Sequence, residues 1–348
     1  MRRQIIIGDI HGCYDELQSL LDKVGLNKDD QIISAGDIID RGPKSMEVVK
    51  FFREGKECLV VCGNHERKHL NKIYTYAQEI TKLQLGQYYD KTINWMCTLP
   101  YFYENDDVIV VHAALIPGLE LKKQPPEVLC GSTSGERYLE QALNGESWYK
   151  AYRGNKPIVF GHHFVGDTPL IYNDRVYGID TGACHGGYLT AITVPDFKVY
   201  SVKAKEDYWE SEKKKWQKQV IVNRPWKSMK WEQIENEINR FKHCEEHEVV
   251  KYVKLLEVWV QKLRDSIPGM VKSIERITEQ ILIDSGEGDF SEFAKRHSLS
   301  QFLFICYNGR LNIDVLLKKC ISPEKTIEMA KILGISLAEK PEDLLNLP

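Results

Sequence analysis

Three short motifs carry acidic, imidazole and amide side chains directly behind apolar runs of the chain. The motifs are GDIHG, GDIIDRG and GNHE, and their polar residues are Asp9, His11, Asp37, Asp40, Arg41, Asn64 and His65. Carboxylate, amide and imidazole groups together suit manganese, iron or zinc ions. Phosphatases and nucleases use two such ions, held about 3.5–4 Å apart. The motifs therefore predict a two-metal site for hydrolysis at phosphorus.

The elements that must position these residues are strands of one sheet. Each motif follows an apolar run at once, and helical spacing of apolar residues follows the first motif, as in residues 13–24. In a parallel α/β sheet the carboxyl ends of neighbouring strands share one crevice, so the polar side chains should converge there. Buried charges are costly unless they are neutralised, and divalent cations neutralise them. Asp9 and His11 lie on one side of an extended chain and can bind one ion, while Asp37 can bridge to a second.

Imidazoles from later in the chain complete the second half of this site. The second ion needs Asn64 and further nitrogen ligands, which His112 in VVHAAL and His162 in VFGHHFVG can supply. His163 follows directly, and we interpret it as a partly buried structural histidine.

In this order, the three motifs, the histidine of HAAL and the first histidine of GHH resemble the calcineurin-like metallophosphoesterases. The resemblance covers about residues 3–202 and is closest to the phosphoprotein phosphatase branch, which includes bacterial symmetrical diadenosine tetraphosphatases and the phosphatase module of bacterial RNA-repair enzymes. It implies that the first metal is bound by Asp9 and His11, that Asp37 bridges, and that the second metal is bound by Asn64, His112 and His162. It also implies that His65, hydrogen-bonded to Asp40, is the general acid and that Arg41 holds phosphate oxygens.

The resemblance also implies a second phosphate-binding arginine, for which the chain offers two candidates. Arg153 lies nine residues before His162, and Arg137 lies in STSGER. The chain departs from the family at HAAL, where HGG or HAG is usual, and carries an HGG only later, at His185. The order of the motifs favours His112 as the ligand.

The coarse pattern predicts an α/β fold. Three strand–helix steps form one sheet, and short β-rich runs after Pro100, including residues 188–195 and 197–202, predict a second, largely antiparallel sheet. In the connection between them, CGSTSGER (130–137) is predicted as loop. Together with the resemblance, this predicts a two-sheet β-sandwich flanked by helices, the calcineurin-like phosphoesterase fold. The remaining chain is mainly helical, so we expect a catalytic domain over 1–204 and a helical accessory region over 205–348.

Composition limits the class of protein and its partners. The 348 residues carry a net charge of −3, which gives no global basic signature for nucleic acid. The first apolar run ends at Gly8, too short for a signal sequence, and no tract approaches the ~20 apolar residues that span a bilayer. Nine scattered cysteines favour reduced thiols, and hence the cytoplasm. Cys130 and Arg137 are one residue too far apart for the phosphate loop of a cysteine-dependent phosphatase.

These observations predict a two-metal phosphoesterase in which a metal-bound hydroxide attacks phosphorus. Two divalent ions are expected, manganese first and iron or zinc as alternatives. Protein phosphoserine or phosphothreonine is the first substrate prediction, diadenosine tetraphosphate and related nucleotides the second, and RNA-end phosphates the third. A degenerate phosphatase fold that acts as a binding module is the non-enzymatic alternative, and the intact set of ligands argues against it.

Overall fold

The computed structural model describes residues 2–242, 244, 246–286 and 289–346. The chain divides into two compact units, the first ending at Val220 and the second beginning at Ile221. The first unit therefore includes most of α9 (Tyr208–Asn223). The boundary expected at 204/205 stays a prediction.

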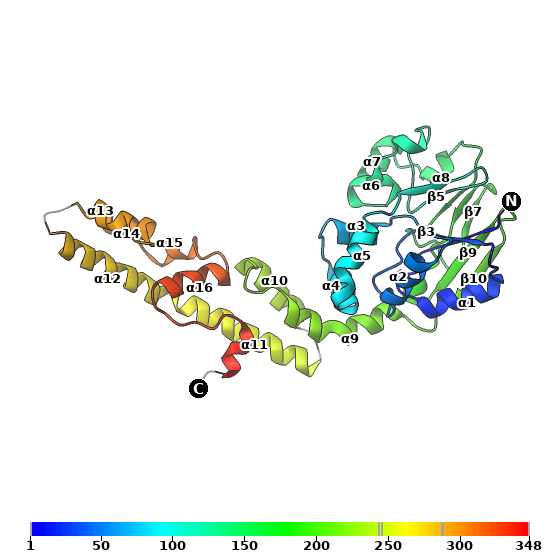
Figure 1. Cartoon of the computed structure of the whole chain (residues 1–348). Helices are drawn as coiled ribbons and strands as arrows, with labels where there is room; N and C mark the ends of the chain where they lie inside the picture. The colour runs from blue at the N-terminus through cyan, green and yellow to red at the C-terminus, as the bar shows by residue number, and fades with distance from the viewer. Residues whose placement is uncertain (1, 243, 245, 287–288, 347–348) are drawn as a thin grey trace. The chain divides into compact units, whose positions relative to one another are not determined.

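The first unit contains two five-stranded sheets (Figure 1). The first sheet has the order β10-β9-β1-β2-β3, formed by β1 (Gln4–Ile7), β2 (Gln31–Ser34), β3 (Cys58–Val60), β9 (Tyr188–Val194) and β10 (Val199–Lys203). The second has the order β4-β5-β6-β8-β7, formed by β4 (Phe102–Glu104), β5 (Ile109–Val111), β6 (Ile158–Phe160), β7 (Leu170–Tyr172) and β8 (Val176–Gly178). β1, β2 and β3 are parallel to one another.

The prediction that residues 188–195 and 197–202 belong to the second sheet is wrong. These form β9 and β10 of the first sheet, where β9 runs antiparallel to β1 and Ile192 lies opposite Ile6. The second sheet is mixed, because β5, β6 and β8 are parallel and only the edge strands β4 and β7 are antiparallel. Alternating apolar residues identify a strand but not the neighbour with which it pairs.

Helices cover the outer faces of both sheets. The α-helices of the first unit that precede α9 are α1 (Tyr14–Val24), α2 (Ser45–Glu54), α3 (Asn64–Leu70), α4 (Tyr76–Leu85), α5 (Tyr89–Met96), α6 (Pro126–Leu129), α7 (Thr133–Leu143) and α8 (Trp148–Ala151). Side chains of α1 and α2 share a core cluster with the first sheet, and those of α6 and α8 share one with the second. The order of layers is thus helices, sheet, sheet, helices, which confirms the predicted sandwich.

The isoleucines of β1 show why the first strand is apolar on both faces. Ile6 packs in the cluster between the two sheets, whereas Ile5 and Ile7 pack with the helices on the outer face. All three are fully buried. Successive strand residues point to opposite faces, so a strand covered on both sides needs a continuous apolar run. Each buried isoleucine contributes about 1.5–3 kcal/mol of transfer free energy.

One predicted loop is helical. Residues 133–137 of CGSTSGER form the first turns of α7, and Ser132 caps this helix by accepting a hydrogen bond from the backbone N–H of Gly135 at 3.3 Å. Serine before a helix supplies an acceptor for such an N–H group. The small polar residues that suggested a loop are therefore the start of a helix.

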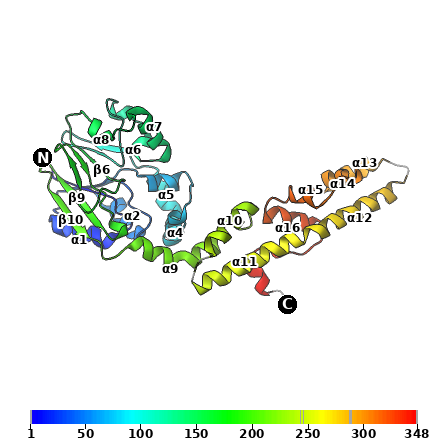
Figure 2. The same cartoon turned by 180° about the vertical axis from the view of Figure 1, so that it is seen from behind.

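The second unit is helical (Figure 2). Its helices are α10 (Trp231–Phe241), α11 (His247–Asp265), α12 (Ile267–Ser285), α13 (Phe290–Lys295), α14 (Ser300–Tyr307), α15 (Ile313–Leu317) and α16 (Pro323–Ile332). An apolar core joins α12 to the shorter helices through residues such as Met270, Ile274 and Leu303. This confirms the predicted helical C-terminal region. Within the described ranges, no helix is long and apolar enough to cross a bilayer.

Candidate metal centre

The predicted ligands lie at the ends of neighbouring strands. Asp9 and His11 follow β1, Asp37 follows β2, Asn64 opens α3 behind β3, His112 follows β5, and His162 follows β6. The parallel strands of each sheet deliver these residues to one edge, where the two sheets meet above their shared core. The structure thus brings together the set that was predicted from three separate motifs and two later histidines.

The backbone at this edge is strained. The φ angles of His11, Asp37, Asp40, Arg41 and His162 are positive, between 45° and 71°. Residues other than glycine occupy this left-handed region at a cost of about 1–3 kcal/mol each, and such residues gather at functional sites. These φ angles let the backbone turn sharply where it leaves each strand. The polar side chains are thereby directed into the shared crevice.

Backbone hydrogen bonds and one buried carboxylate brace these loops. The N–H of His11 donates to the carbonyl of Asp37 at 2.8 Å, which ties the first motif to the second. Glu66 accepts hydrogen bonds from the backbone N–H groups of Asp37, Ile38 and Gly63 at 2.9–3.0 Å. Burial and the charge of Asp37 raise the pKa of Glu66 to about 7. Glu66 therefore joins the second and third motifs through these hydrogen bonds.

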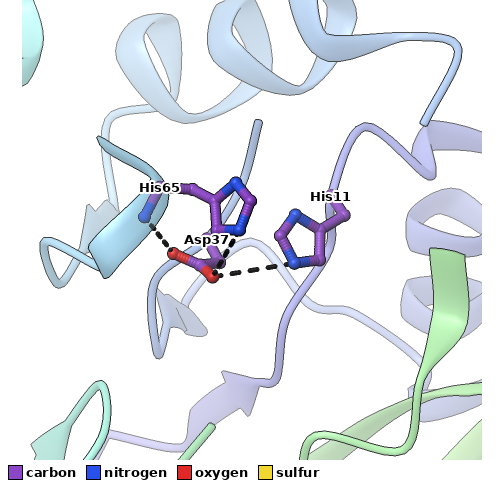
Figure 3. A group of neighbouring side chains, drawn as sticks. All are labelled: His11, Asp37 and His65. Atoms are coloured by element: carbon purple, nitrogen blue, oxygen red, sulfur yellow. Dashed lines mark hydrogen bonds and ion pairs between the residues drawn. The ribbon is translucent and has the colours of Figure 1, made fainter. Parts of the chain in front are cut away.

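Asp37 stands between two groups of possible metal ligands. One group is His11, Asp37 and His65, and the other is Asp37, His112 and His162. The distances from Asp37 Oδ2 are 3.6 Å to His11 Nε2 and 3.9 Å to His65 Nε2. Figure 3 shows both imidazoles turned toward this carboxylate. Its other oxygen, Oδ1, lies 3.4 Å from His112 Nε2. One carboxylate thus offers an oxygen to each side, as a bridging ligand must.

The amide of Asn64 belongs to the second group. Its Oδ1 atom lies 3.1 Å from His112 Nε2 and 3.1 Å from His162 Nδ1. Asp9 is placed differently, since its carboxylate accepts the backbone N–H of His162 at 3.0 and 3.2 Å. His65, rather than Asp9, completes the first group of three. The role of Asp9 as a ligand stays a prediction.

The orientation of two imidazoles suits metal binding. His11 Nδ1 donates to the carbonyl of Ile39 at 2.8 Å, and His112 Nδ1 donates to the carbonyl of Ala35 at 2.9 Å. A backbone acceptor on one ring nitrogen holds the proton there, so the other nitrogen is the one that can bind a cation. Both Nε2 atoms face Asp37.

The electrostatics of the site also suit cations. Burial and the neighbouring Arg41 hold the pKa of His11 well below its usual value, and burial together with His112 lowers the pKa of His162 to about 2. Burial and Asp180 raise the pKa of Asp9 well above its usual value. Neutral imidazoles are the form that ligates metal, and crowded carboxylates gain from a nearby cation. Asp37 raises the pKa of His112 to about 10 against the effect of burial, so this ring must release a proton to bind an ion. The donor set and its burial therefore fit two divalent ions.

His65 and Asp40 form a buried pair next to this centre. His65 Nδ1 donates to Asp40 Oδ2 at 2.6 Å, while its Nε2 atom is buried and has no hydrogen-bond partner among the described protein groups. Burial alone would raise the pKa of Asp40, but hydrogen bonds and charges from His69 and His65 hold it well below its usual value. The carboxylate thus orients the ring and leaves Nε2 facing the metal ligands.

Two further residues hold Asp40 and were missed from the sequence. His69 Nε2 donates to Asp40 Oδ1 at 2.9 Å, and the hydroxyl of Tyr89 lies 2.9 Å from His69 Nδ1. Gln78, fully buried on α4, donates to Asp40 Oδ2 and lies 3.3 Å from His65 Nδ1. The spacing of His65 and His69, four residues apart on one helix face, could have indicated the first contact. Nothing in the sequence near Gln78 could have indicated the second.

The three predicted phosphate-binding arginines have different positions. Arg41 Nη1 lies 3.2 Å from His11 Nε2, so it reaches the centre. Arg153 is exposed and donates to the carbonyls of Lys150 and Tyr152 in its own segment. Arg137 is exposed on α7. The structure therefore brings only Arg41 into contact with the predicted ligands, and the roles of the other two stay predictions.

The chain is similar in sequence to known phosphoesterases. The family model described as calcineurin-like phosphoesterase matches residues 2–177. The asymmetrical bis(5'-nucleosyl)-tetraphosphatase PrpE of Bacillus velezensis is 33% identical over 238 residues, which cover 58% of this chain and 93% of that protein. The symmetrical bis(5'-nucleosyl)-tetraphosphatase of Nitrosococcus oceani is 32% identical and covers 58% and 69%. A solved serine/threonine phosphatase of Saccharomyces cerevisiae aligns with a TM-score of 0.41 at 18% identity, covering 58% and 79%.

The family model matches half of the chain and includes all three motifs and both later histidines. Calcineurin-like phosphoesterases use a binuclear divalent metal centre, for which the groups around Asp37 are the candidate ligands. This chain therefore belongs to the calcineurin-like phosphoesterase family and is a metallophosphoesterase.

Proposed function

We propose that this chain hydrolyses dinucleoside polyphosphates such as diadenosine tetraphosphate. The observation that carries the proposal is the match to a bis(5'-nucleosyl)-tetraphosphatase at 33% identity over 93% of that protein's length. From the sequence alone, protein phosphoserine and phosphothreonine are the first substrate prediction and nucleotides the second. The similar proteins support the nucleotide alternative better, so the order is reversed here.

The metal ions would be held by the residues at the strand ends. Asp9, His11 and Asp37 would hold one ion, and the other would be held by Asp37, Asn64, His112 and His162, with manganese preferred and iron or zinc as alternatives. When bound, the two ions supply an activated water molecule and neutralise charge on the phosphate.

The remaining steps fall to side chains of this chain. Arg41 presents a guanidinium group beside His11, where it can hold phosphate oxygens in a forked geometry. His65 donates its Nε2 proton to the leaving oxygen, which departs as a phosphate group of the nucleotide product. Asp40 keeps the Nδ1 proton of His65 in place and stabilises the charged ring before transfer. His69 and Gln78 position Asp40.

The experiment that tests this function is a substrate panel with the 348-residue protein and manganese. Diadenosine tetraphosphate, a phosphoserine peptide and a phosphorylated RNA end would be compared by kcat/KM. We expect the highest value for diadenosine tetraphosphate, and chromatography of the products would show which phosphoanhydride is cleaved. A higher value for the phosphopeptide would contradict the proposal and restore the first expectation.

Three finer assignments belong to the same proposal. We assign residues 205–348 to a helical accessory region, and we assign the second phosphate contact to Arg153 or Arg137. Separate changes of each arginine to alanine would distinguish them, because only the loss of the true phosphate contact should raise KM for the substrate. We also place the protein in the cytoplasm, a reducing compartment that would keep its unpaired cysteines reduced.

A further inference from the structure

Helix α3 presents two different faces to the site. His65 and His69, four residues apart, contact Asp40 and are buried. Residues four apart share one side of a helix, so Asn64 and Lys68 lie together on another side. The helix that carries the candidate general acid therefore also carries a second polar surface, of which the proposed function uses Asn64 but not Lys68.

This second surface borders a cavity of about 420 Å³, the α3–α7 pocket. It is lined by Asn64, Arg67, Lys68, Asn71, Ile73, Gly131, Ser132, Thr133, Ser134, Glu136 and His162. Two lining residues, Asn64 and His162, are predicted ligands of the second metal. His11 and His65 are not among its lining residues. The pocket therefore opens at the His162 end of the centre, and the candidate acid lies at the other end.

The wall opposite α3 is the start of α7. Ser132, Thr133 and Ser134 line the pocket, and Ser132 Oγ caps the helix and lies 2.9 Å from Ser134 Oγ. Gly131 has a φ of +70°, and a Cβ added there would lie 2.5 Å from His162 Nε2. The loop before α7 is thus packed directly against a predicted ligand, which keeps the hydroxyl groups beside the centre.

The charges in the pocket favour an anion. Arg67 is held by Glu127 and by the hydroxyl of Tyr101 at 2.9 Å, so its guanidinium is largely committed. Lys68 is half-buried and, across the described part of the chain, forms no ion pair with a carboxylate. Glu136 is exposed and is the one carboxylate that lines the pocket. Lys68 is therefore the cation with free capacity for a ligand.

We propose that the α3–α7 pocket is an anion subsite for a phosphate chain that stays attached to the attacked phosphorus. This rests on the proposed function. The phosphorus of a monoester carries one substituent, the leaving group, whereas a phosphorus inside a dinucleoside polyphosphate carries two arms. The leaving arm departs at His65, and the retained arm extends past Asn64 and His162 to Lys68 and the hydroxyl groups of α7. The pocket thereby selects internal phosphoanhydrides over monoesters.

The test is the binding of inorganic phosphates to the 348-residue protein loaded with manganese. Isothermal titration would give the affinities for tripolyphosphate and for orthophosphate, a single phosphate that cannot occupy the centre and the pocket at once. We expect the ratio of these affinities to fall about tenfold in Lys68→Gln, because the pocket loses a charged hydrogen-bond donor to the retained phosphates. Lys91→Gln, an equal charge change at an exposed position of α5, should leave the ratio at the wild-type value.

A second variant tests the opposite wall. Ser134→Asp adds a carboxylate to the pocket in the first turn of α7, where negative charge is compatible with the helix. We expect it to lower the same ratio. An unchanged ratio in both Lys68→Gln and Ser134→Asp would overturn the subsite. Because this readout is the binding of inorganic phosphates and not the release of nucleotides, it stays decisive even if the substrate panel shows that diadenosine tetraphosphate is not hydrolysed.

Discussion

The two units of this chain bury different kinds of side chain. In the first unit, ionisable residues less than 5% exposed surround the centre: Asp9, His11, Asp37, Asp40, His65, Glu66, His69 and His112. Among the described residues from 221 onward, the buried polar residues are Thr278, Ser322 and Thr326. Arg224, whose side chain is 7% exposed, is paired with Glu237. The first unit tolerates costly buried charge, and the second is held by an apolar core.

The two units also differ in the number of residues with an unfavourable backbone conformation. All ten described non-glycine residues with positive φ lie in the first unit, and five of them are at the centre. In the second unit, the described residues with positive φ are glycines at helix ends or turns: Gly286, Gly309 and Gly334. Strained loops and buried charge persist only where surrounding structure compensates for them, and they mark a site under chemical demands. The comparison therefore locates the chemistry in the first unit.

The largest expected effect is that of His65→Asn. Removing the candidate general acid should lower kcat for diadenosine tetraphosphate about 10²–10⁴-fold, because the leaving oxygen loses its proton donor. The matched control is His247→Asn in the second unit, whose side chain is 89% exposed. Steady-state kinetics would measure both. A His65→Asn variant that kept more than a tenth of the wild-type rate would contradict the assignment of the general acid to the first unit.

The next largest effect is expected in the buried interior of the second unit. Trp259 is fully buried, and its indole N–H donates to the carbonyl of Ala338 at 2.9 Å. Trp259→Ala should lower the free energy of unfolding of the second unit by about 3–5 kcal/mol. Urea denaturation would measure this loss, and hydrolysis of an aryl phosphate should stay within about twofold of wild type if chemistry resides in the first unit alone.

Trp148→Ala is the matched change in the first unit. Trp148 is 5% exposed and packs against Phe160, two residues before His162, with ring centroids 5.0 Å apart. The cavity left there should disturb the segment that carries His162, so both stability and hydrolysis should fall. Equal activity losses in the two tryptophan variants would argue against the division of roles between the units.

A smaller effect is expected at Gln78. Gln78→Met keeps a similar volume but removes the donor to Asp40, so kcat should fall about tenfold, the loss expected when a charge-assisted hydrogen bond is removed, with little change in KM. Gln87→Met, at an exposed position, is the control. A change in KM alone would show that Gln78 acts on substrate binding and does not position the acid.

The smallest expected effect is that of Glu235→Gln. Its ion pair with Arg264, at 2.6 Å, joins side chains that are 49% and 37% exposed. Exposed pairs of this kind contribute about 0–1 kcal/mol, and salt weakens them. In the first unit, Asp30→Asn should cost more, because that carboxylate is 5% exposed and also accepts the N–H of Asn27 at 2.7 Å. Urea denaturation at low and high salt would compare the two.

Several features were predictable because they depend on local order in the chain. An apolar run followed by an acid or imidazole predicts a strand with a functional end, and parallel strands bring such ends together. The placement of Asp37 between two groups of histidines follows from this rule. The helical C-terminal region and the two-sheet fold were also predictable from apolar periodicity and composition.

Only the tertiary structure decided the contacts between distant segments, because no pattern in the nearby sequence marks them. The pairing of β9 with β1, and so the sheet to which it belongs, depends on which strand edge remains open. Gln78 reaches Asp40 from a separate helix, and Asp9 turns toward the backbone of His162 on another sheet. The types and spacing of the motif residues alone were enough to predict a metal centre, because the donor atoms available are a property of the side chains. Which groups orient those ligands was decided by folding, because packing brings together residues that are distant in the chain.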